Sequence, residues 1–141
     1  MAEDSLKQQI VLMIEKADRS LEAARSLIKS GNSDFGSSRA YYGAFYSLQA
    51  LLLTRGLVYS KHSGVISGFS EHFIRPGDFS PHFAKHISRL FRERHIGDYD
   101  FGQVITTEEA EKDYELAHEL IEAVKEYLCA NGFLSRKQLI P

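Results

Sequence analysis

A long apolar stripe with helical spacing near the N-terminus limits what this chain can fold into. Its apolar residues recur at intervals of four and three positions: Ile10, Ile14, Ala17, Leu21, Ala24 and Ile28. This spacing gathers them on one face of an α-helix, and charged side chains occupy the other faces. We therefore predict a packed helix over residues 5–30. Gly31 and Asn32 follow it, and both tolerate the left-handed backbone that ends helices.

A second helix is predicted over residues 34–55, and it is apolar nearly all round. Aromatic residues at positions 41, 42, 45 and 46 precede a run of leucines, and small residues are interleaved with them. A helix without a polar face touches several neighbours, so we expect this one at the centre of the domain. The small residues permit close helix approach, either inside the domain or across a dimer interface.

The remaining elements are also predicted to be helical. A short helix covers residues 64–73, and Ser80-Pro81 opens a fourth helix that fades between residues 95 and 98. After a loop at 99–105, Thr106 and Glu109 form a capping box that begins the last long helix, which Gly132 ends. The predicted fold is all-α: an up-and-down antiparallel bundle of four long helices plus one short helix over residues 1–132, with a tail at 133–141.

Composition excludes several classes of protein. The chain has 141 residues and one cysteine, Cys129, so it has no internal disulfide and no multi-cysteine zinc site. No segment approaches the ~20 apolar residues that span a bilayer, and the acidic N-terminus does not resemble a signal peptide. We expect a cytoplasmic protein without a membrane association or a cofactor. The histidines show no ligand-like companion spacing, so no metal site is expected: His72, His82, His86 and His118.

Arg94 is the most informative position in the chain. At 100° per residue it shares an arc of roughly 100° with Phe83, Ile87 and Leu90, so it lies on the apolar stripe of the fourth helix. A buried guanidinium needs an anion or carbonyl partner, because an unpaired buried charge costs several kcal/mol. Two interpretations stay open. Arg94 either forms an internal salt bridge or helix cap, or it presents its fork of N–H groups to a phosphate.

Other polar residues gather near Arg94 in the sequence. His95, Asp98 and Tyr99 follow it within six residues, and each has an ordinary interpretation as a surface, turn or packing residue. Arg39 is a second cation on a largely buried helix. His62 lies at a predicted helix start, where free backbone N–H groups favour anions. Arg39 and His62 are equally consistent with local caps or ion pairs.

Three segments together resemble the HEPN domain, in the small stand-alone prokaryotic branch that is often described as an uncharacterised protein family. They are SRAYYGAFY at 38–46 with the leucines after it, KHSGVIS at 61–67, and residues 94–99. The resemblance covers roughly residues 5–130. It implies a homodimer of helical bundles and, for many members, a minimal nucleotidyltransferase encoded alongside as the other half of a toxin–antitoxin-like pair. Many HEPN domains are metal-independent ribonucleases with an arginine, four to six residues and a histidine, and the two protomers place these motifs in one cleft.

The chain departs from this motif. If Arg94 is the motif arginine, Tyr99 occupies the usual place of the histidine. Arg89 and His95 fit the spacing literally, but Arg89 is predicted on the solvent side of its helix. His95 directly follows Arg94 and can still reach the same cleft.

Three functional hypotheses follow. In the first, a ribonuclease, His95 or Tyr99 handles the proton of a ribose 2′-OH while Arg94 stabilises the charged phosphorane. A tyrosine with an ordinary pKa near ~10 is a poor base at neutral pH, which weakens this hypothesis.

The second hypothesis is a nucleotide- or RNA-binding module without catalysis. Arg94, Arg39 and His62 hold phosphate, Asp98 lies at the site, and Tyr42 or Tyr99 stacks on a base. In the third hypothesis, the bundle is an interaction partner of a nucleotidyltransferase, for which a tyrosine near the motif is a candidate modification target.

Overall fold

The structure, a computed structural model, describes residues 2–102 and 104–139, and its regular elements are helices. In chain order they are α1 (Ala2–Lys29), α2 (Ser33–Leu53), α3 (His62–Phe69), the π-helical segment η1 (Ser70–Ile74), α4 (His82–Tyr99), α5 (Thr107–Ala130) and the 3₁₀ segment η2 (Arg136–Leu139). No strand occurs in the described residues. The predicted all-α antiparallel bundle of four long helices and one short helix is confirmed.

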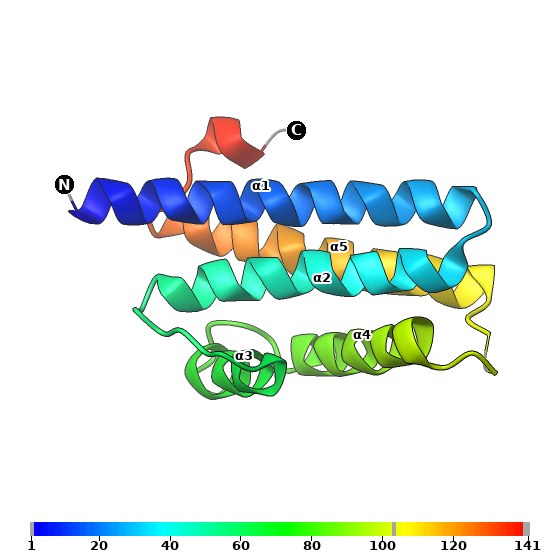
Figure 1. The fold of residues 1–141 in the computed structure, drawn as a ribbon. Helices are drawn as coiled ribbons and strands as arrows, with labels where there is room; N and C mark the ends of the chain where they lie inside the picture. The colour runs from blue at the N-terminus through cyan, green and yellow to red at the C-terminus, as the bar shows by residue number, and fades with distance from the viewer. Residues whose placement is uncertain (1, 103, 140–141) are drawn as a thin grey trace.

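The central position of α2 is also confirmed. Figure 1 shows α1 running antiparallel beside α2, with α5 behind them and α3 and α4 following one another along the other side of α2. Helix α2 contacts α1, α3, α4 and α5. Tyr41, Leu48 and Leu51 are fully buried there, in the one main core cluster. Within the described residues, no helix is both long and apolar enough to cross a membrane.

The helix ends use the signals that the sequence indicates. Gly31, Gly56 and Gly132 have φ of 89°, 70° and 82°, a backbone region that costs residues with a Cβ atom about 1–2 kcal/mol. The capping box is present: the backbone N–H of Glu109 donates to Thr106 Oγ1 (3.1 Å), and the backbone N–H of Thr106 donates to Glu109 Oε1 (3.0 Å).

Three segments differ from the prediction. The fourth helix is predicted to fade by residue 98, but α4 continues to Tyr99 and carries Asp98 in its last turn. The short helix expected at 64–73 changes to π-helical geometry at Ser70. In the expected tail, Leu134 is buried in the core and Arg136 pairs with Glu126, so the start of this segment packs on the bundle.

A buried polar cluster ties three helices together. Asp113 of α5 is fully buried; Ser37 of α2 donates a hydrogen bond to its Oδ2 (2.6 Å), and Arg89 Nε of α4 donates to its Oδ1 (2.9 Å). The prediction that Arg89 lies on the solvent side is therefore wrong, because α5 covers that side of α4. The arginine of the literal Arg89-to-His95 motif is thus paired with a buried carboxylate, with 30% of its own side chain exposed.

Gly97 fixes the end of α4 against the start of α2. A Cβ atom at this position would lie 2.7 Å from the backbone oxygen of Asp34, closer than real Cβ contacts come. Only glycine therefore allows this approach of the two backbones. The contact sets where Arg94, Asp98 and Tyr99 stand relative to the aromatic residues of α2.

Candidate functional site

Arg94 lies on the apolar stripe of α4, as its helical phase predicts. Phe83, Ile87 and Leu90 of that stripe are buried, and the Arg94 side chain is only 11% exposed. The guanidinium is surrounded by aromatic rings, and its carbon lies 5.4–5.9 Å from the ring centroids of Tyr41, Tyr42, Phe91 and Tyr99. Such contacts attract a cation through the ring quadrupole, and the Tyr41 hydroxyl also lies close enough to Arg94 to accept a hydrogen bond from it.

The guanidinium is incompletely partnered within the described part of the chain. Its Nη1 lies 3.7 Å from Asp98 Oδ2, one helical turn away, which is beyond hydrogen-bond distance. Its Nε is buried and has no hydrogen-bond partner. A buried donor without an acceptor costs about 1–3 kcal/mol. Asp98 therefore leaves Arg94 incompletely paired, and because Nε is buried, only the far end of the fork can meet solvent.

Tyr41 and His62 form the inner side of the site. The Tyr41 hydroxyl lies 2.7 Å from Nδ1 of His62, the first residue of α3, and the imidazole stacks on Phe45 at 4.1 Å between ring centroids. Burial raises the pKa of Tyr41 well above its ordinary value, against the opposing effect of Arg94. Burial and, second, the Arg94 charge lower the pKa of His62. We conclude that both groups are neutral at pH 7.

Arg39 is a second cation that contacts the Tyr42 ring. The guanidinium carbon of Arg39 lies 4.5 Å from the Tyr42 ring centroid, and that of Arg94 lies 5.8 Å from the same centroid. Two like charges near one ring repel each other when no anion lies between or beside them. Arg39 and Arg94 therefore both contact the Tyr42 ring.

His95 and Tyr99 lie at the solvent side. Tyr99 is 62% exposed, and its ring centroid lies 5.2 Å from that of His95, which is also exposed. Asp98 stands between them in sequence with a side chain that is 24% exposed. The last turn of α4 therefore presents an imidazole, a phenol and a carboxylate beside the partly buried guanidinium.

The structure thus gathers six of the seven residues proposed from the sequence around Arg94 and Tyr42, and His95 joins through its contact with Tyr99. Sequence reasoning missed one participant, Tyr41, which it places among the core residues of its helix. The pairing of Tyr41 with His62 and Arg94 depends on the packing of α2, α3 and α4 together, which no spacing along the chain reveals.

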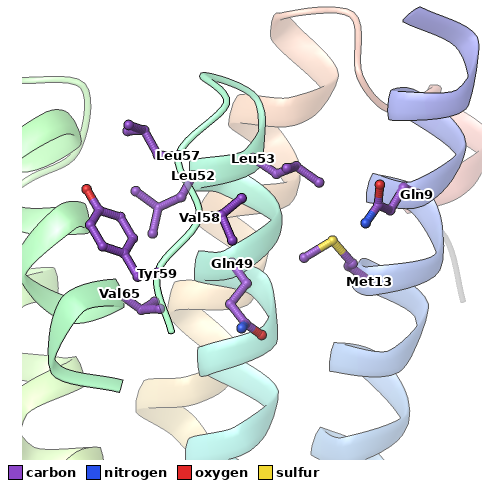
Figure 2. Close-up of a pocket in the computed structure, with 9 residues that line it drawn as sticks. All are labelled: Gln9, Met13, Gln49, Leu52, Leu53, Leu57, Val58, Tyr59 and Val65. Atoms are coloured by element: carbon purple, nitrogen blue, oxygen red, sulfur yellow. The ribbon is translucent and has the colours of Figure 1, made fainter. Parts of the chain in front are cut away.

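One hollow lies outside this cluster, and another meets it at Asp98. Figure 2 shows a pocket between α1, the end of α2 and the segment before α3, lined mainly by apolar residues such as Met13, Leu53 and Tyr59 and by no charged residue. The other is a broad hollow beside the end of α4, lined by Asp34, Phe35 and Asp98 among others.

The fold and the arginine–aromatic cluster define an all-α bundle protein with an incompletely paired arginine at one end of α4. Residues 10–127 match the HEPN domain family, and the chain belongs to that family.

Several relatives agree with this assignment. The chain is 37% identical over 128 residues to "Putative toxin MJ0142" of Methanocaldococcus jannaschii, covering 91% of this chain and 87% of the relative. It is 37% identical over 94 residues to a UPF0332 protein of Thermotoga maritima, covering 67% and 70%. The crystal structure of TT1696 from Thermus thermophilus is similar with a TM-score of 0.73 and 21% identity, covering 84% of this chain and 97% of that chain. This last likeness supports the fold alone.

Proposed function

We propose that the Arg94 face binds RNA or nucleotide phosphate. The observation that carries the proposal is the Arg94 fork, whose side chain is 11% exposed and whose Nη1 lies 3.7 Å from Asp98 Oδ2, too far for a hydrogen bond. A phosphate oxygen at the exposed end of the fork would supply charge-assisted hydrogen bonds, which are roughly twice as strong as neutral ones.

The surroundings suit a nucleotide rather than a bare anion. Arg39 adds a second positive charge beside Tyr42. The exposed ring of Tyr99 offers a stacking surface, and base–aromatic stacking contributes about 1–3 kcal/mol per base. His62 begins α3, whose first turn has no side-chain cap, so its backbone N–H groups add positive potential.

A homodimer is part of the proposal. Apolar side chains stand exposed around the end of α4, with Phe101 99%, Val104 79% and Phe35 55% exposed. A second copy packed over them would remove this surface from water and bring two Arg94 groups to one cleft. Sedimentation velocity should then give a dimer, and Phe101→Ser should shift it toward monomer. A wild-type monomer at every concentration would contradict this part.

Ribonuclease action is the second candidate, and the His95–Tyr99 pair favours it. The two rings lie 5.2 Å apart on the solvent side of Arg94, where either can exchange a proton with a ribose 2′-OH. Arg94 would stabilise the charged phosphorane. Two relatives bear the name "Putative toxin", and RNA cleavage is an activity by which such a protein would be toxic. We further propose a minimal nucleotidyltransferase as the protein partner, which an adjacent reading frame would support and an isolated gene would weaken.

Binding is tested first, with a labelled single-stranded RNA and fluorescence anisotropy. Arg94→Gln should weaken binding at least about tenfold, while Arg92→Gln, an exposed arginine on the same helix, should change it less than about threefold. The affinity of the wild type should fall with rising salt. Equal losses for the two variants would reject the Arg94 site.

Cleavage is tested separately, because binding does not require it. Purified protein is incubated with RNA in EDTA beside Arg94→Ala, His95→Ala and Tyr99→Phe. Cleavage that requires Arg94 and either His95 or Tyr99 supports the enzyme. Cleavage that survives all three substitutions comes from another site or a contaminant, and no cleavage at all leaves the binding module as the function.

A further inference from the structure

Two histidines of α4 and a glutamate of α5 converge far from Arg94. His82 Nε2 lies 3.0 Å from Glu119 Oε1, and His86 Nε2 lies 2.9 Å from Glu119 Oε2. His82 and His86 are four residues apart, so they stand on one face of α4 one turn apart. The expectation that these histidines lack companions is therefore wrong: each is the other's companion, and α5 supplies the third group.

The three side chains lie close enough together to bind one metal ion. Their ligand atoms all lie within 4.8 Å of one another. Ligands around a tetrahedral zinc ion, each about 2.0–2.2 Å from it, stand roughly 3.3 Å apart, so small side-chain rotations bring these three into place. The side chains are 45%, 15% and 51% exposed for His82, His86 and Glu119, which leaves the ion a route from solvent.

We propose that His82, His86 and Glu119 form a site for a divalent transition-metal ion, with water completing the coordination. Two imidazoles and one carboxylate form a ligand set that zinc uses in proteins, and imidazole also suits copper and nickel. Magnesium and calcium prefer oxygen ligands, so they should bind poorly here.

Ser80 contacts the His82 ring nitrogen that does not face Glu119. Its Oγ lies 2.7 Å from Nδ1 of His82. When Nδ1–H donates to Ser80, the other ring nitrogen Nε2 is left with a free lone pair for a metal ion. Without an ion, the Ser80 hydroxyl can donate to Nδ1 instead, and Nε2–H then donates to Glu119. The hydroxyl serves either tautomer, so metal binding requires no loss of this contact.

The ion would act on stability rather than on the Arg94 chemistry. His82 and Arg94 are twelve residues apart on one helix, which corresponds to roughly 18 Å at about 1.5 Å per residue. A metal held by α4 and α5 would join these two helices at the end of α4 opposite Arg94. Because the ion binds only the folded chain, the melting temperature should rise with metal concentration.

The test uses untagged full-length protein, titrated with Zn²⁺ by calorimetry and melted with and without Zn²⁺. The wild type should bind one ion per chain and gain thermal stability. Glu119→Gln and the double variant His82→Asn/His86→Asn should bind at least about tenfold more weakly, and Ser80→Ala should bind measurably more weakly. The control His118→Asn removes an exposed histidine next to Glu119 that stacks on Tyr114, and it should bind as the wild type does.

Three outcomes would overturn the proposal. One is equal Zn²⁺ affinity in the wild type and Glu119→Gln, another is a loss in His118→Asn as large as in the double variant, and the third is Zn²⁺ binding that occurs only by linking two chains. If the double variant does not fold in EDTA, Glu119→Gln decides alone, since it keeps the size and a hydrogen-bond acceptor of the side chain.

Discussion

The guanidinium carbon of Arg94 lies 5.4 Å from the centroid of the Tyr41 ring, whose hydroxyl lies 2.7 Å from Nδ1 of His62. A charge on α4 is thereby coupled to an imidazole on α3 through a tyrosine of α2. This chain of contacts joins three helices at one place, and its electrostatic consequence can be measured directly.

The first prediction concerns the pKa of His62. Burial lowers this pKa from its ordinary 6.5, and the Arg94 charge lowers it further. Arg94→Met keeps the packing but removes the charge. The pKa of His62 should rise in this variant while staying below 6.5, as followed by NMR titration. Arg92→Met is the control and should leave it unchanged; the same pKa in wild type and Arg94→Met would contradict the coupling.

The second prediction concerns Gly97. Alanine there places a Cβ atom 2.7 Å from the backbone oxygen of Asp34, which cannot rotate away as a side chain could. Gly97→Ala should lower the free energy of unfolding by about 1–3 kcal/mol, as overpacking does, and should weaken RNA binding by displacing Arg94. Gly102→Ala is the matched control, because its Cβ atom would meet nothing nearer than Asp100 Oδ1 at 3.6 Å. Urea unfolding of both variants measures the difference, and equal stabilities would refute the close-approach argument.

Much of the fold could be predicted from the sequence, because each long helix carries a local signal. The stripe from Ile10 to Ile28, the capping box at Thr106 and the glycine after each of three long helices need no tertiary information. The same is true of Arg94, whose helical phase places it among apolar side chains. The position of Arg89 could not be predicted in this way, because its partner Asp113 is distant in sequence. A helix face that contacts another helix through an ion pair carries polar residues, so its sequence resembles that of a solvent-exposed face.

The contacts of Tyr41 could not be predicted from the sequence either. Tyr41 is an aromatic residue in an apolar helix, and nothing local separates it from Phe45. Its role depends on where α3 and α4 dock, which is set by contacts such as Gly97 against Asp34. Likewise, the spacing of His82 and His86 becomes informative only when Glu119 is known to face them.

The third prediction concerns the buried cluster of Asp113. Asn in its place keeps the shape but removes the charge that pairs with Arg89 Nε at 2.9 Å. Burial raises the pKa of Asp113 despite its hydrogen bonds from Ser37 and Arg89, so removing the charge weakens these bonds but also relieves a desolvation cost. Asp113→Asn should therefore lower the free energy of unfolding by only about 1 kcal/mol. Glu3→Gln, which breaks the exposed pair with Lys7, should have no measurable effect. A loss no larger in Asp113→Asn than in Glu3→Gln would show that the pair is not structurally important.

The fourth prediction concerns pH and Glu93, which is 7% exposed. Burial, followed by the charges of Asp113 and Glu109, raises its pKa above the ordinary 4.5. Between 4.5 and the raised value the folded chain binds more protons than the unfolded chain, so this residue's contribution to stability falls as pH rises through that window. Glu93→Gln should therefore stabilise the protein at pH 7 and flatten the pH dependence there.

The measurement is urea unfolding between about pH 4.5 and pH 8, with the exposed Glu111→Gln as control. We expect a gain at pH 7 that shrinks as the pH approaches 4.5, and a control profile parallel to the wild type. A loss of stability at pH 7 in Glu93→Gln would mean that the carboxylate is favourably paired, in contradiction to the direction of its pKa.

The central claim is that the guanidinium of Arg94 receives the phosphate of a nucleotide ligand, and NMR of its side-chain N–H groups tests this most directly. On titration with a short single-stranded RNA, the Arg94 signals should shift strongly and saturate with the binding isotherm, while those of Arg92 on the same helix shift little. RNA binding that saturates while the Arg94 signals stay in place would contradict the account.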